Sequence, residues 1–100
     1  MILVRNVFRC KFGKGGEVAR LIVATKDQWG PVGQLPMRVL TDLGGPFDTV
    51  VTETVIESID EYNQLLRERF ANAEVARLLS PLGGLVESGW REYFTIEAAS

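Results

Sequence analysis

Histidine is absent from this sequence of 100 residues, and cysteine occurs once, as Cys10. Imidazole is the usual general base near neutral pH and the commonest metal ligand of proteins. Its absence excludes Ser–His–Asp and Cys–His sites, a haem ligated by histidine, and zinc sites that use histidine. A single cysteine can form neither an intrachain disulfide nor a thiolate cluster. We therefore expect no metal site and no other cofactor.

Long apolar runs are lacking too. No stretch approaches the roughly 20 residues of a membrane-spanning helix, and the apolar N-terminal residues lead directly to Arg5 rather than into the core of a signal peptide. We expect a cytoplasmic protein with no membrane partner. The net charge of −2 argues against a nucleic-acid partner, because such proteins bind phosphates through clustered Lys and Arg.

The residues that are present have the profile of one globular domain. Hydrophobic residues make up 46% of the chain and charged residues 24%, and a chain of this length buries about two-thirds of its unfolded surface. We expect a single domain over residues 1–100. Apolar alternation predicts strands over 2–12, 37–43, 47–57 and from Gly89 or Trp90 to Ile96.

Two segments between these strands have helical spacing. Apolar residues recur at that spacing from Val18 to Thr25, after a glycine-rich loop. Ser58 and Glu61 form a capping box that begins a second helix, which we expect to kink near Asn72 and to stop by Pro81 or the glycines after it. We expect Asp42 and Asp48, which flank the turn between the two middle strands, to cap that turn.

The resulting order, β-α-β-β-α-β, predicts an α+β fold of the ferredoxin-like type. Its four-stranded antiparallel sheet carries both helices on one face. The other face stays uncovered and includes apolar side chains whichever way the first strand is turned, a choice that the sequence leaves open. Packing of two copies face to face would cover it, so we expect a homodimer.

Short motifs resemble a known family. Arg5-Asn6-Val7-Phe8, the segment 38–51 with its Gly44-Gly45-Pro46 turn, Glu53, and the segment 58–62 together are similar to NIPSNAP-like members of the dimeric α+β barrel superfamily. Antibiotic-biosynthesis monooxygenases are relatives there. The resemblance implies homodimerisation and a ferredoxin-like fold, but it selects no reaction, because the superfamily includes oxygenases, isomerases, decarboxylases and proteins without assigned activity.

Five residues are candidates for a small-molecule pocket between sheet and helices. Asn6 shares a strand face with Phe8, where an unpaired amide is costly unless it meets a backbone group or a polar cavity. Aromatic side chains that could line the same pocket are Trp29, Tyr62 and Trp90. The alternative is that these aromatics are core and interface residues. Family oxygenases are thought to use Asn and Trp side chains around the substrate, and Asn6 and Trp90 are residues of those types.

Glu53 is a candidate buried acid in a strand rich in β-branched residues. Burial would raise the pKa of such a carboxylate and let it act as a base. The alternative is an ion pair on the open sheet face with Arg5, Arg9 or Arg91. The glycine-rich loop at residues 13–16 could present amides to a phosphate, but it lacks the full P-loop spacing and is read as a simple connection.

The sequence thus predicts a small homodimeric α+β barrel that binds a small molecule. One alternative is a cofactor-independent monooxygenase acting on an electron-rich aromatic, and another is a non-catalytic structural or regulatory dimer. An RNA-recognition module shares the element order, but the third expected strand carries no pair of exposed aromatics with which to stack bases.

Overall fold

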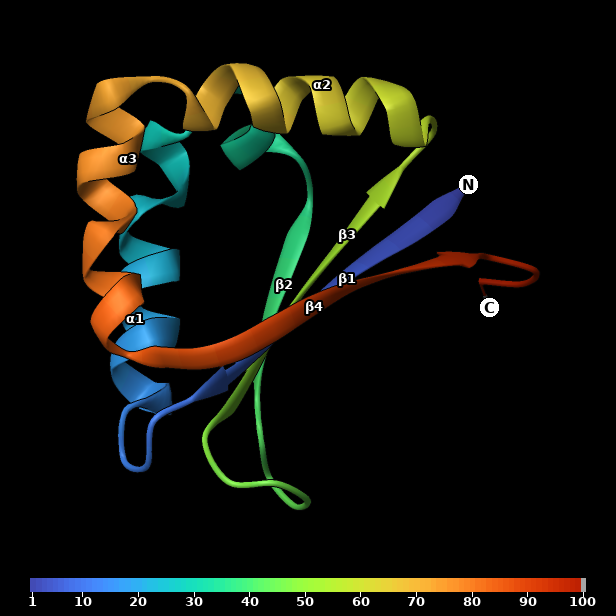
Figure 1. The fold of residues 1–100 in the computed structure, drawn as a ribbon. Coiled ribbons are helices and arrows are strands. Elements are labelled where there is room, and N and C mark those ends of the chain that lie inside the picture. The colour runs from blue at the N-terminus through green and yellow to red at the C-terminus, as the bar shows by residue number, and fades with distance from the viewer. Residues whose placement is uncertain (100) are drawn as a thin grey trace.

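The computed structural model describes residues 1–99, which form a four-stranded sheet and three α-helices (Figure 1). The strands are β1 (Ile2–Cys10), β2 (Met37–Thr41), β3 (Thr49–Ile56) and β4 (Val86–Thr95). The α-helices are α1 (Gly15–Thr25), α2 (Ile59–Phe70) and α3 (Ala73–Leu79). Short 3-10 segments are η1 (Lys26–Gln28), η2 (Gly30–Gln34) and η3 (Ser80–Gly84). The predicted element order is confirmed, with the second helical region divided in two.

The sheet has the order β2-β3-β1-β4, and every neighbouring pair is antiparallel. Figure 1 shows all three helices on one face of this sheet, with α2 across one end of the sheet and α3 turning from the direction of α2 to lie beside α1. No helix within residues 1–99 covers the opposite face. The ferredoxin-like fold expected from the sequence is therefore the observed one.

Alternation along β1 decides which residues face the helices. Val4 is fully buried beneath α2, and Cys10 packs in a second cluster with Val18 and Ile22 of α1. The even-numbered residues of β1 thus face the helices, and the odd-numbered residues face outward. This settles the choice that the sequence left open.

Asn72 separates α2 from α3. Its side-chain oxygen accepts hydrogen bonds from the amides of Glu74 (2.9 Å) and Val75 (3.3 Å), so a new helix begins where a kink was expected. Ser58 caps α2 as predicted, accepting from the amide of Glu61 at 3.3 Å. The new direction brings Val75 of α3 into the cluster around α1.

The last strand begins earlier than the sequence indicated. Gly89 was expected to mark its start, but it lies inside β4, opposite Phe8. A Cβ atom at this position would come within 2.9 Å of the carbonyl oxygen of Val7. The glycine is therefore explained by close backbone approach rather than by a strand boundary.

Candidate functional site

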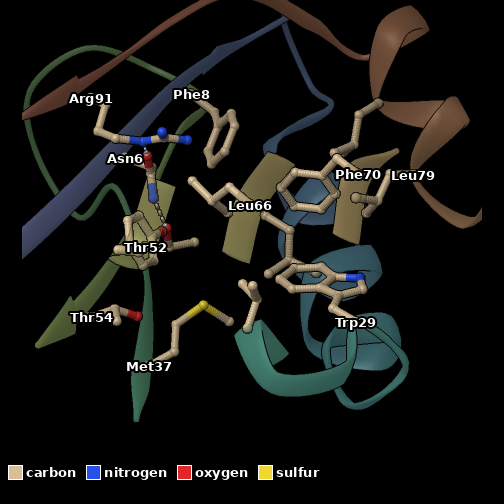
Figure 2. A pocket seen from close by; sticks show the side chains of 14 residues that line it. Asn6, Phe8, Trp29, Met37, Thr52, Thr54, Leu66, Phe70, Leu79 and Arg91 are labelled. Carbon is tan, nitrogen blue, oxygen red and sulfur yellow. Dashed lines mark hydrogen bonds between the residues drawn. The ribbon is translucent and has the colours of Figure 1, made fainter. Parts of the chain in front are cut away.

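A cavity of about 240 Å³ lies between the sheet and the helices. Most of its lining is apolar, and Figure 2 shows the side chains around it. On the helical side the rings of Trp29 and Phe70 meet edge to face, with centroids 6.5 Å apart. Leu79 of α3 continues this apolar wall, so the division of the second helical region helps to build the site.

The opposite wall is polar and is centred on Asn6. The Nε atom of Arg91 donates to the Asn6 side-chain oxygen at 2.6 Å, and the Asn6 amide nitrogen donates to the Thr52 hydroxyl at 3.2 Å (Figure 2). These side chains come from β4, β1 and β3, which are adjacent strands. Because both ends of the Asn6 amide are engaged, its orientation is fixed by its neighbours.

Tyr62 of α2 closes the polar wall from the helical side. Burial raises the pKa of its phenol, while a hydrogen bond with Asn6 and the positive charge of Arg91 act in the opposite direction. The guanidinium carbon of Arg91 lies 5.8 Å from the centre of the Tyr62 ring, which is cation–π range. With its pKa raised above the ordinary value near 10, the phenol is protonated and neutral at physiological pH.

The structure brings four of the five predicted pocket residues to this cavity: Asn6, Phe8, Trp29 and Tyr62. The placement of Trp90 was wrong. Trp90 lies opposite Val7 in the sheet register, so its side chain is on the outer face, where it is 48% exposed. Its neighbour Arg91 takes the inward position opposite Asn6 and was missed as a cavity residue.

Glu53 lies on the outer face and does not approach the cavity. Its carboxylate is buried and pairs with Arg38, a partner that the sequence analysis did not name. Arg5 is opposite Glu53 in the register but pairs with Glu92 at 3.6 Å. Arg9 lies two rows away from Glu53 on the same face, beyond Val7, and Arg91 lies on the opposite face, so neither forms the expected pair. The ion-pair alternative is thus the observed one, with a different arginine.

The outer face is organised in rows across the strands. One apolar row crosses all four strands, a second crosses three, and a row of alternating charge lies between them. The first apolar row is formed by Leu40, Val51, Val7 and Trp90. The charged row is formed by Arg38, Glu53, Arg5 and Glu92. The second apolar row is formed by Val55, Leu3 and Phe94.

The glycine-rich loop is occupied by the protein's own carboxylate. Asp48 accepts hydrogen bonds from the amides of Gly13 (2.8 Å) and Gly15 (3.0 Å), which hold its pKa below the ordinary value. Asp48 therefore joins two loops instead of capping its own turn, a role that Asp42 performs by accepting from the Thr49 amide. The reading of this loop as a connection agrees with these contacts.

Within residues 1–99 no cluster of three or more Cys, Asp or Glu side chains is placed to hold a metal ion. None of the helices in that range has the length and apolar character needed to cross a bilayer.

Comparison with solved structures gives close matches to this fold. No protein-family model matches the sequence, and no curated protein is significantly similar to it. A NIPSNAP-like domain protein from Burkholderia xenovorans superposes with a TM-score of 0.86 at 12% identity, covering 99% of this chain and 87% of that one. A NIPSNAP family protein from Agrobacterium tumefaciens has a TM-score of 0.78 at 18% identity, covering 97% and 88%.

The chain has the NIPSNAP-like fold. A third solved structure shares this fold at a lower TM-score. SnoaB, a cofactor-independent oxygenase from Streptomyces nogalater, has a TM-score of 0.65 at 15% identity, covering 98% of this chain and 94% of that one. The NIPSNAP-like and monooxygenase-like resemblance stated from the sequence is confirmed at the level of the fold. Sequence identities this low show a shared fold and do not show a shared activity.

Proposed function

We propose that this protein binds a small planar molecule in the cavity between sheet and helices. The observation that carries the proposal is the division of the cavity into an apolar aromatic wall and a polar wall centred on Asn6. Ligand sites are typically apolar cavities with a few converging polar groups that fix orientation. The ring of a ligand would lie toward Trp29 and Phe70, and its polar substituent toward Asn6 and Arg91.

The size of the cavity limits the ligand. An apolar cavity of about 150 Å³ accepts a benzene molecule. The cavity of this protein measures about 240 Å³, which suits one or two fused rings rather than a large polycyclic compound.

The two tryptophans allow a test with an internal control. A nitrogen–proton correlation NMR spectrum contains one indole signal for Trp29, in the cavity, and one for Trp90, on the outer face. We expect titration with 2-naphthol to shift the Trp29 signal and leave the Trp90 signal in place. A shift of Trp90 alone, or of neither signal, would contradict the proposal.

We further propose that two copies pack through their outer sheet faces. Trp90 and Phe94 are half exposed there, and the Nε atom of Arg9 is buried without a hydrogen-bond partner within residues 1–99. A second copy would cover the rings and could supply acceptors. A two-fold axis that runs along the strands would place the charged row of one copy over the same row of its partner in reverse order. Because the row has four residues of alternating sign, each arginine would then face a glutamate, so this face suits a two-fold pair.

Cofactor-independent oxygenation is the second candidate function. The cavity would desolvate an electron-rich dihydroxyarene, which reduces dioxygen itself. One oxygen atom enters the ring as a hydroxyl while the ring becomes a quinone, and the other leaves as water. The neutral Tyr62 phenol beside the half-buried Asn6 favours this candidate because it can hydrogen-bond the phenolic oxygens.

Oxygen consumption tests this second candidate. With a panel of dihydroxynaphthalenes, we expect wild-type protein to consume oxygen faster than the Asn6→Ala variant. Equal rates would remove the enzyme function and leave binding. If the NMR titration also fails, a structural or regulatory dimer becomes the better description.

A further inference from the structure

Arg91 gives the cavity an unbalanced positive charge. It is the one charged side chain among the cavity's lining residues, and no carboxylate within residues 1–99 lines the cavity with it. Arg91 also takes part in no salt bridge within that range. The arginines of the outer face differ, since Arg5 and Arg38 each pair with a glutamate.

The guanidinium is held in one orientation. Its Nε atom is engaged by Asn6 at 2.6 Å, Asn6 is fixed in turn by Thr52 at 3.2 Å, and the group lies over the Tyr62 ring. With Nε occupied, the two terminal nitrogens remain to form an end-on fork. Such a fork matches the two oxygens of a carboxylate.

We propose that the cavity takes planar aromatic carboxylates, with the ring against Trp29 and Phe70 and the carboxylate on the terminal nitrogens of Arg91. This inference rests on the proposed small-molecule binding and adds the chemical class of the ligand. Arg91 lines the cavity, but it lies on the edge strand β4 and its side chain is also exposed to solvent. A carboxylate there can lie at the mouth while the apolar ring is buried, so it need not be fully desolvated.

A pair of isosteric probes separates charge from shape. 2-Naphthoate is an anion at neutral pH, and 2-naphthamide has nearly the same shape without the charge. Following the Trp29 indole signal, we expect naphthoate to bind wild-type protein about 10- to 100-fold more tightly, as for hydrogen bonds to a charged group.

Two variants of the polar wall complete the test. Arg91→Gln should remove the preference for naphthoate. Arg77→Gln, which changes an exposed side chain of α3 outside the cavity, should keep it. Asn6→Asp keeps an acceptor for the Arg91 Nε atom but supplies a carboxylate from the protein. This variant should therefore lose the preference for naphthoate over naphthamide, because the new carboxylate offsets the positive charge of Arg91.

The outcomes separate the two proposals. Equal binding of both probes by wild-type protein, or an unchanged preference in Arg91→Gln, would overturn the carboxylate inference and leave small-molecule binding in place. Failure of both probes to shift the Trp29 signal would overturn both. A preference that is lost in Arg91→Gln and Asn6→Asp and kept in Arg77→Gln is the expected result.

Discussion

Asp48 shows how a single side chain joins two loops. Its backbone has a φ of 57°, a left-handed conformation that Asp and Asn adopt more readily than other side chains. Asp48 lies beside the turn between β2 and β3, and its carboxylate accepts hydrogen bonds from the amides of Gly13 and Gly15 at the start of α1. The residue thus fixes the relative position of two loops that are far apart in the sequence.

Asp48→Asn isolates the contribution of the charge, because asparagine tolerates the same backbone conformation. The depressed pKa means that ionised Asp48 stabilises the folded state above the unfolded pKa, near 3.8, and that this stabilisation is lost as the pH falls through the folded pKa. We expect the variant to unfold at lower urea concentration at neutral pH and the difference to shrink below pH 4. Asp27→Asn, at an exposed side chain, is the control, and a pH-independent difference would argue against the charge.

At the scale of elements, the cap at Asn72 determines the direction of α3. A continuous helix through this region would carry Val75 and Leu79 away from the cluster around α1 and open the cavity wall. The cap therefore contributes to the site without touching it.

We expect Asn72→Ala to destabilise the protein by about 1 kcal/mol, the usual effect of removing a helix cap. Urea denaturation measures this difference, and Gln64→Ala on the exposed side of α2 is the matched control. A stability equal to that of wild type would show that packing alone sets the break between the helices.

The elements were predictable from the sequence because each has its own local signal. Alternation in β1, the β-branched run in β3 and the N-cap at Ser58 all agree with the observed structure. The break at Asn72 was expected only as a kink, because its capping role depends on the turn that the chain makes there. Asn6, Phe8 and Tyr62 were found as cavity residues because they lie on the inward faces of their elements, and Trp29, between η1 and η2, was found from its aromatic character.

The two errors at the site have one cause. β4 is an edge strand with aromatic residues on both faces, so hydrophobicity does not reveal which face is inward. Trp90 was assigned inward because it is apolar, and Arg91 outward because it is charged, whereas pairing with β1 requires the reverse. The partner of Glu53 was missed for a similar reason, since Arg38 becomes its neighbour only through the register of β2 and β3.

At the scale of the whole molecule, the outer sheet face predicts association. Trp90→Lys places a charge at the β4 end of its four-strand apolar row, and we expect wild-type protein to be a dimer and this variant to be a monomer. Light scattering after size-exclusion chromatography measures both masses. Phe47→Ser removes an exposed ring outside the sheet and should leave the dimer intact, and a Trp90→Lys dimer would place the interface elsewhere.

A native mass spectrum tests the central claim most directly, because it reports subunit number and bound small molecules together. After incubation with 2-naphthoate, we predict a dimer whose mass is increased by one naphthoate for each subunit. A monomer that carries no added mass at the same protein concentration would contradict both the interface and the cavity function.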